Sequence, residues 1–315
     1  MLRPLTFAVC LTAAPALADI PKVATDITPV HSLTARVMAG LATPDLIVPP
    51  GASPHGHAMR PSEARALEQA DVVFWIGEAL TPWMAQPVKT LAGDATVVEL
   101  LDDPHTHVLA FREGATFEHH DHDEDDHHAD EHGDEHDDHA EDDHHDGDPH
   151  AWLDPENGKA WLAVIAETLS AQDPDNAETY RANAADGMAE IDAVIAKLDD
   201  WLTPVRDRPF IVFHDAYHYF ESRFGLAAAG SISLGDASDP SPARIVEIRD
   251  KVRQMQAGCV FSEPQFNAGL VATVFEGTEA RTAVLDPLGT LITPGPRQYV
   301  DTLEALGQNI AACLN

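Results

Sequence analysis

The chain has 315 residues, 44% of them hydrophobic, and carries 53 acidic against 19 basic residues, a formal net charge of −34. Nucleic-acid binders displace phosphate counterions with clustered Lys and Arg, and proteins that dock on anionic membranes use basic patches, so this balance excludes both classes. A chain of this length can bury a large core and typically forms two domains.

The first 18 residues have the pattern of an export signal. Arg3 supplies a positive start, residues 5–14 supply an apolar stretch too short to span a bilayer, and residues 16–18 (ALA) form a small-residue cleavage site. We therefore expect cleavage after Ala18 and an exported mature chain. No later run approaches the ~20 apolar residues of a transmembrane helix.

Export also determines how the cysteines are interpreted. Once Cys10 is removed with the signal, Cys259 and Cys313 remain, an even number in a compartment that permits disulfides. A bond between them would close a loop of about 55 residues and, from chain entropy, contribute about 4 kcal/mol. The alternative is a pair of buried thiols.

Short apolar runs alternate with helical patterns from Lys22 onward. Strands are predicted at 22–27, 45–49, 71–77 and 95–100, and helices at 32–41, 61–70 and 149–170. Alternation of this kind predicts a parallel sheet covered by helices.

Residues 174–203 contain no internal proline and are bounded by Asp173 and Pro174 at the start and Pro204 at the end. A helix of that length spans ~45 Å, more than a crossover inside one domain needs. We therefore predict an N-terminal α/β lobe over residues 19–172, a rigid linking helix over 173–204 and a C-terminal α/β lobe over 205–315.

The second lobe repeats the alternation of the first. Beyond Pro209, strands are predicted at 210–213, 226–232, 258–262 and 282–286, with helices starting near Pro242, Ala268 and Pro296. Both lobes should therefore contain parallel sheets flanked by helices.

Residues 118–148, termed the histidine–acid stretch, contain ten histidines, seventeen acidic residues and no Lys or Arg. They cannot form a core, so we expect a mobile, solvated loop inserted in the first lobe. Imidazoles with carboxylates suit zinc, copper or nickel, whereas solubility alone requires only the acids. We predict several weak, exchanging metal sites with ligands among His119, His120, His122, His127, His128, His132, His136, His139, His144 and His145.

Side chains of metal-ligand type follow four of the predicted strands. Ligands of open α/β sheets bind outside the carboxyl ends of strands. The residues in such places are His55 and His57 after 45–49, His214 after 210–213, Glu263 after 258–262, and Asp286 at the end of 282–286.

His150 joins this set from the start of a helix, where Asp148 can cap and orient the turn. Taken singly, each residue has a structural explanation: Asp286 precedes Pro287 and can make a turn, and Glu263 can be a cap. Three histidines and a carboxylate expected at one crevice between the lobes nevertheless predict a tetrahedral zinc site.

The segments around these residues resemble the ZnuA family, the periplasmic zinc-binding proteins of ABC transporters. The resemblance rests on GASPHGHAMRPSE, DPHAWLDP, VFHDAYHYFESRFGL, FSEPQF and VLDPLGT, on the acidic histidine-rich loop before DPH, and on a matching cysteine pair. It covers essentially the whole mature chain.

The resemblance implies two α/β lobes bridged by one long helix, with the metal between them and His55, His150 and His214 as ligands. It implies Zn²⁺ as the transported cargo and an inner-membrane ABC permease as partner, with a periplasmic zinc chaperone as a further partner. We expect a periplasmic monomer that is not an enzyme.

Two positions depart from the family pattern. Some relatives place a glutamate directly before the first ligand histidine, where this chain has Pro54, which offers no side-chain donor. The fourth ligand is then water or a carboxylate, and we predict Asp286. His57 stands where relatives often have tyrosine, and we assign it, with Glu263, to a secondary site or to the surroundings of the ligands.

Three alternatives stay open at this point. Manganese-binding relatives carry glutamate where His214 stands, and three imidazoles favour zinc over the harder manganese ion. A zinc-sequestering buffer or adhesin would use the same site without a transporter. A zinc hydrolase would add a metal-bound water with Glu263 or Asp286 as base, although the chain contains no HExxH or GxSxG motif.

Overall fold

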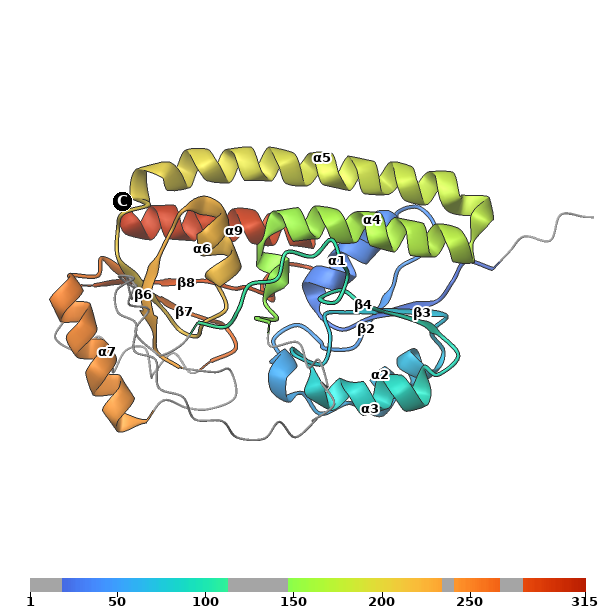
Figure 1. Ribbon diagram of the computed structural model, residues 1–315, viewed down its shortest axis with the longest axis horizontal. Helices are drawn as coiled ribbons and strands as arrows, with labels where there is room; N and C mark the ends of the chain where they lie inside the picture. The colour runs from blue at the N-terminus through green and yellow to red at the C-terminus, as the bar shows by residue number, and fades with distance from the viewer. Residues whose placement is uncertain (1–18, 113–146, 234–240, 267–279) are drawn as a thin grey trace, which may run out of the picture.

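The computed structural model describes residues 19–112, 147–233, 241–266 and 280–315. In this part of the chain two α/β lobes lie side by side, and one long helix runs along both (Figure 1). No helix of the described residues is both long and apolar enough to cross a membrane. The predicted signal peptide, the ten histidines of the histidine–acid stretch and the helix expected near Ala268 lie outside these residues.

The first lobe is built on a parallel four-stranded sheet. Its strands follow the order β2-β1-β3-β4 across the sheet, with β1 at Val23–Thr25, β2 at Asp45–Leu46, β3 at Val72–Trp75 and β4 at Thr96–Glu99. All four strands lie where the sequence predicts them, because short runs rich in Val, Ile and Phe bounded by polar turns favour buried strands.

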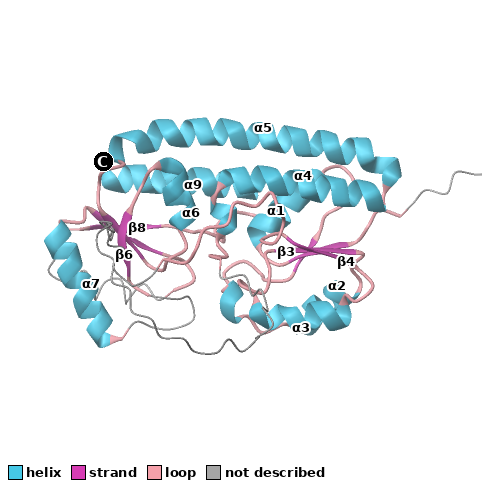
Figure 2. Cartoon of the chain, in the orientation of Figure 1, coloured by secondary structure: helices cyan, strands magenta, loops and turns pink. Residues whose placement is uncertain are grey.

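Helices cover both faces of this sheet (Figure 2). Along β3, Val72 and Phe74 belong to one apolar cluster and Val73 and Trp75 to another, as the two-residue period of a strand requires. The first cluster includes side chains of α1 and α4, and the second includes those of α2 and α3. These helices span Thr28–Val37 (α1), Pro61–Glu68 (α2), Pro82–Leu91 (α3) and Pro155–Gln172 (α4).

The helix α3 has no counterpart among the predicted elements. Its sequence contains two prolines, and Pro87 lies inside the helix, where it removes one backbone hydrogen bond. The helix forms nevertheless because Met84 and Val88 are buried against the sheet. Tertiary packing therefore overrides the local signal.

The second lobe has the same architecture as the first. Its parallel sheet has the order β6-β5-β7-β8, with strands at Phe210–Val212 (β5), Ala228–Ser231 (β6), Cys259–Ser262 (β7) and Arg281–Val284 (β8). Its described helices are α6 (His218–Phe224), α7 (Pro242–Met255) and α9 (Gln298–Leu314). The predicted fold class, two parallel-sheet α/β lobes joined by a long helix, is confirmed.

The linking helix α5 spans Ala177–Leu202, 26 residues or ~39 Å. It is shorter than the predicted helix because 3₁₀ turns occupy Pro174–Asn176 and Thr203–Val205. The side chain of Asp173 does not cap the backbone of α5. Its carboxylate instead accepts hydrogen bonds from Asn176 Nδ2 at 2.7 Å and Tyr180 OH at 2.9 Å.

One apolar core extends through both lobes. It includes Val72 of the first sheet, Leu198 of α5 and Phe261 of the second sheet. At Gly307 of α9 a β-carbon would collide with Leu198, so glycine permits these two helices to approach closely. The lobes therefore share their packing rather than forming two separate bodies, and the predicted domain boundaries stay a prediction.

A disulfide joins Cys259, the first residue of β7, to Cys313 near the end of α9. Their Cα atoms are 6.0 Å apart and 54 residues separate them in the chain. The predicted bond is therefore confirmed, and the alternative of two buried thiols is wrong.

A buried carboxyl group lies at the carboxyl end of β1. Asp26 has no exposed surface, and its two oxygens accept hydrogen bonds from the backbone N–H groups of Ile27 and Ile76, each at 2.7 Å. Burial raises the pKa of Asp26 to about 7, although these two hydrogen bonds lower it.

This group should make the protein less stable as the pH rises from about 4 to about 7. Between those values the folded chain keeps the proton on Asp26, whereas the unfolded chain, with its ordinary pKa of 3.8, has lost it. The free energy of unfolding should then fall by about 4 kcal/mol in total. Asp26→Asn does not titrate, so urea unfolding of both proteins at each pH isolates the effect. A difference between them that stays constant from pH 4 to 7 would contradict it.

Candidate metal centre

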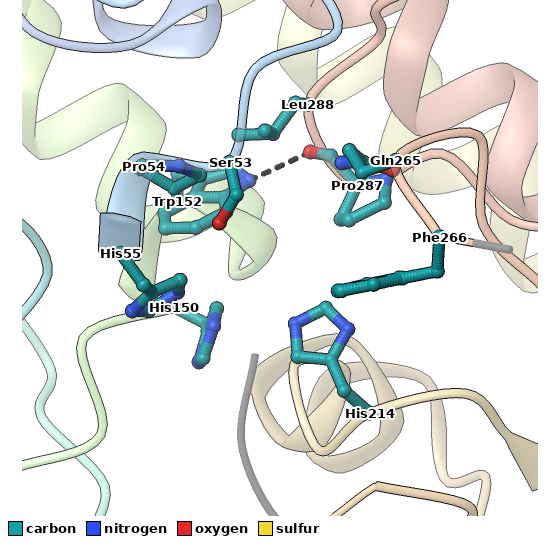
Figure 3. A pocket seen from close by; sticks show the side chains of 10 residues that line it. All are labelled: Ser53, Pro54, His55, His150, Trp152, His214, Gln265, Phe266, Pro287 and Leu288. Carbon is teal, nitrogen blue, oxygen red and sulfur yellow. Dashed lines mark hydrogen bonds between the residues drawn. The ribbon is translucent and has the colours of Figure 1, made fainter. Parts of the chain in front are cut away.

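A cavity between the two lobes brings three predicted ligand histidines together. Figure 3 shows the rings of His55, His150 and His214 gathered at one place, with Trp152 and Phe266 beside them. The first lobe contributes His55 and His150, and the second contributes His214. The lining residues are Ser53, Pro54, His55, His150, Trp152, His214, Gln265, Phe266, Pro287 and Leu288.

The spacing of the three rings is close to that of ligands on one ion. The ring centroids of His55 and His150 are 5.5 Å apart, and those of His150 and His214 are 5.4 Å apart. Two imidazoles on a tetrahedral zinc, with Zn–N near 2.0–2.1 Å, have ring centres roughly 5 Å apart. Within the described residues, however, no three His, Cys, Asp or Glu side chains are placed so that they could hold a metal ion as they stand.

His150 is oriented by the residue two positions before it. Asp148 Oδ1 accepts a hydrogen bond from the backbone N–H of His150 at 3.0 Å and lies 2.7 Å from its Nδ1. Because a carboxylate can only accept, the proton belongs on Nδ1 and the lone pair on Nε2. The side chains of His150 and Asp148 are 7% and 3% exposed, so the pair is fixed inside the protein.

His214 has the same kind of partner in the second lobe. It follows β5, and Glu263 follows the neighbouring parallel strand β7, so both lie at the carboxyl edge of the sheet. Glu263 Oε1 lies 2.6 Å from His214 Nδ1, and the Glu263 side chain is 0% exposed. Glu263 therefore orients His214, and a carboxylate in this position also raises the basicity of the ring.

His55 lies in a 3₁₀ turn at Pro54–Gly56. Trp83 of α3 fixes this turn, since its Nε1 donates a hydrogen bond to the carbonyl of Pro54 at 2.6 Å. His57 does not line the cavity; its Nε2 lies 2.9 Å from Glu63 Oε2.

Asp286 is not among the residues that line the cavity, although Pro287 and Leu288 directly after it are. Its Oδ2 accepts hydrogen bonds from Thr290 Oγ1 at 2.9 Å and from the backbone N–H of Leu291 at 3.0 Å. Its Oδ1 is buried and has no hydrogen-bond partner among the described residues. That oxygen is the one available to a cation.

Sequence reasoning missed the aromatic and neutral polar residues of the cavity. Trp152 packs beside His150 and donates from Nε1 to the carbonyl of Pro287 in the other lobe at 2.8 Å. Phe266 stacks on Phe213 and meets the His214 ring at 5.5 Å. Aromatic residues near the ligands, in HAW and EPQF, are the signal that could have found them.

Ion pairs and hydrogen bonds also hold the two lobes together beside the cavity. Arg112, from the first lobe, contacts the carboxylates of Asp215 and Glu221 in the second. Burial alone would lower the pKa of Arg112, but the two carboxylates raise it above its ordinary value. Tyr219 OH accepts from Leu109 N–H at 2.9 Å and donates to the Asp148 carbonyl at 2.6 Å. The segment carrying His214 is thus bonded to the one carrying His150.

Comparison with known proteins extends over nearly the whole chain. The family described as "Zinc-uptake complex component A periplasmic" (ZnuA) matches residues 23–313. The chain is 45% identical to a high-affinity zinc uptake system protein ZnuA of Paracoccus denitrificans, over 100% of this chain and 99% of that protein. It is 44% identical to the protein of the same name from Brucella suis, over 93% and 91% of the two chains.

The fold also resembles solved structures. A crystal structure of ZnuA superposes with a TM-score of 0.77, covering 94% of this chain and 100% of the other at 24% sequence identity. That likeness concerns the fold, because the identity is low.

Proposed function

Because this chain belongs to the ZnuA family of zinc-uptake components, we propose that His55, His150 and His214 capture Zn²⁺ in the inter-lobe cavity for delivery to an inner-membrane ABC permease. The chain is the periplasmic zinc-binding component of a high-affinity zinc uptake system. The ligand assignment, cleavage after Ala18, a monomeric state and delivery without any catalytic step are part of the proposal.

The observation that carries the ligand assignment is the pair of carboxylate–histidine contacts. Asp148 and Glu263 fix the Nδ1 atoms of His150 and His214, one from each lobe, and direct the two Nε2 atoms as ligands. Three neutral nitrogen ligands favour zinc over manganese. We assign the fourth position to Asp286 Oδ1, since its partner oxygen is already held by Thr290 and Leu291.

A zinc hydrolase is a poorer fit to the same cavity. Glu263, one of the two candidate bases, already contacts His214, and its side chain has no exposed surface. The enclosed cavity volume is only about 20 Å³, far less than the ~300–1,000 Å³ of pockets for organic ligands. A cation with its ligands needs less room than an organic substrate.

Zinc uptake by three strains at limiting zinc tests the proposed function against a sequestering buffer or adhesin. One strain lacks this protein, one lacks the permease, and one lacks both. We expect the same deficit in all three, because the two proteins act in series. Normal uptake in the strain that lacks only this protein would contradict a role in transport.

For the histidine–acid stretch we propose weak zinc binding that raises the zinc concentration available to the protein. Deleting residues 118–146 should then remove the weak equivalents in calorimetry and leave the tight one. The deletion spares Asp148, whose carboxylate is bonded to His150. Loss of the tight equivalent from a folded deletion protein would show that the stretch supplies a ligand to the main site.

A further inference from the structure

Trp152 is fixed at both ends by the second lobe. It lies in the 3₁₀ turn Ala151–Leu153, directly after the proposed ligand His150, and is 1% exposed. At one end its backbone carbonyl accepts a hydrogen bond from Tyr299 OH of α9 at 2.7 Å. At the other end the indole Nε1 donates to the carbonyl of Pro287 at 2.8 Å, the dashed line in Figure 3. The indole therefore bridges the two lobes beside the cavity.

The carbonyl that Trp152 contacts belongs to the segment that carries the proposed fourth ligand. Residues 287–289 directly follow Asp286, and all three of their carbonyls accept hydrogen bonds from side chains. Thr28 Oγ1 of α1 donates to the second of them at 2.5 Å. Gln298 Nε2 of α9 donates to the second and the third, at 2.6 and 3.2 Å. Two of the three donor side chains, Trp152 and Thr28, come from the first lobe, so the first lobe holds this second-lobe segment in place.

Trp152 also packs against the histidine side of the cavity. Its ring centroid lies 5.3 Å from that of His150, and its side chain lines the cavity. The contacts of Trp152 therefore connect a proposed ligand of the first lobe with the segment that follows Asp286 in the second. Moving the two apart would break a buried hydrogen bond and leave its donor and acceptor without partners, which is unfavourable.

A fixed spacing of ligands discriminates between ions by bond length and coordination number. Zinc in proteins takes four short bonds, with Zn–N near 2.0–2.1 Å, whereas manganese prefers an octahedral shell of oxygen ligands. The enclosed cavity volume of about 20 Å³ leaves little room for the water molecules that would complete an octahedral shell. Ligands that are held close together therefore favour zinc, and ligands that can separate admit a larger shell.

We propose that Trp152 is a positioning residue that holds the two lobes at the spacing required by a four-coordinate ion. This spacing adds to the preference of the three imidazoles for zinc and discriminates against six-coordinate ions such as Mn²⁺. Trp152 acts through His150 and the segment after Asp286, and is not itself a ligand. The inference rests on the proposed function, because it requires zinc to bind between ligands of both lobes.

The substitution Trp152→Phe tests this role, since it keeps an aromatic ring and removes the Nε1 donor. Titration of the full-length protein against a competing chelator measures the affinities for Zn²⁺ and Mn²⁺. We expect the zinc affinity to fall about 10-fold, as when a group that orients ligands is lost, and the manganese affinity to change by less than about threefold. Co²⁺ bound in place of zinc should show a changed visible spectrum, which reports its ligand geometry.

Trp161→Phe is the matched control. Trp161 is 0% exposed, and its Nε1 donates to Thr106 Oγ1 at 2.8 Å, so the same substitution removes the same kind of hydrogen bond. Both residues belong to the first lobe, and neither lines the cavity. A purely structural loss should lower the melting temperature of both tryptophan variants. The ratio of zinc to manganese affinity in Trp161→Phe should stay within about twofold of the wild type.

A second pair of variants tests the same segment without changing an indole. Thr28→Val is nearly isosteric and removes the other donor from the first lobe. Its control, Thr34→Val, removes a hydrogen bond that stays within α1, from Thr34 Oγ1 to the carbonyl of Val30 at 2.8 Å. We expect Thr28→Val to lower the zinc-to-manganese ratio about threefold and Thr34→Val to leave it unchanged. This pair decides the test if Trp152→Phe does not fold.

The outcomes separate the inference from the proposed function. An unchanged zinc-to-manganese ratio in folded Trp152→Phe, or an equal fall of that ratio in Trp161→Phe, would overturn the positioning role and leave zinc capture by the histidines untouched. If Trp152→Phe does not fold, an unchanged ratio in Thr28→Val overturns it in the same way. A wild-type protein that binds no zinc tightly would instead overturn the proposed function, and the inference with it.

Discussion

Replacing His214 with alanine should weaken zinc binding by more than 100-fold while leaving the weak equivalents in place. Loss of a group that merely orients a ligand typically costs 10- to 100-fold in metal affinity, and loss of the ligand itself must exceed that. His150→Ala should give a similar loss, because the two rings come from opposite lobes to the same cavity. A titration against a competing chelator measures both.

Graded variants separate coordination from a general disturbance of the fold. Glu263→Gln keeps the shape of the side chain but removes the charge beside His214 Nδ1, so its loss should fall within 10- to 100-fold. His105→Ala, at a histidine side chain that is 77% exposed, should bind zinc like the wild type. His214→Ala with wild-type affinity, in a folded protein, would remove His214 from the ligand set.

The architecture could be predicted from the sequence because its strands and helices are locally encoded. The runs that become β3 and β7 are apolar, short and bounded by polar residues, and that pattern alone predicts buried parallel strands. The helix α3 could not be predicted, because Pro87 inside it argues against it locally and the packing of Met84 and Val88 stabilises it nevertheless. The single core through both lobes likewise depends on contacts between distant segments.

The site could be predicted only in part, for a related reason. A residue directly after a parallel strand must lie at one edge of the sheet, so the sequence predicts that His214 and Glu263 meet. It cannot decide which of them would bind an ion and which would orient the other; the 2.6 Å contact of Glu263 with His214 Nδ1 supports the proposal that His214 is the ligand. Nor could it predict that His57 pairs with Glu63, because the direction of a side chain in a loop depends on the packing around it.

Replacing both Cys259 and Cys313 with alanine should destabilise the protein by about 4 kcal/mol, which lowers the melting temperature by roughly 6 °C for a chain of this size. The bond closes a loop of 54 residues that contains β7, β8 and most of α9. Without it, the unfolded chain regains the conformational freedom that the closed loop denies it. Calorimetric melting of the oxidised wild type and the double variant measures the difference.

Zinc affinity should be unchanged by the same substitutions, as long as the measurement is made well below the melting temperature. The disulfide is at Cys259, the first residue of β7. Glu263 directly follows the last residue of that strand, four residues further along the chain and therefore ~13 Å from the disulfide. On α9 the distance between the disulfide and the site is greater. Cys313 is near the end of this helix, whereas Tyr299 is in its first turn. Tyr299 OH donates a hydrogen bond to the carbonyl of Trp152, which lines the cavity. Weaker zinc binding in the folded double variant would mean that the disulfide strains or orders the site across that distance. Equal affinity would mean that the bond stabilises the second lobe without ordering the proposed ligands.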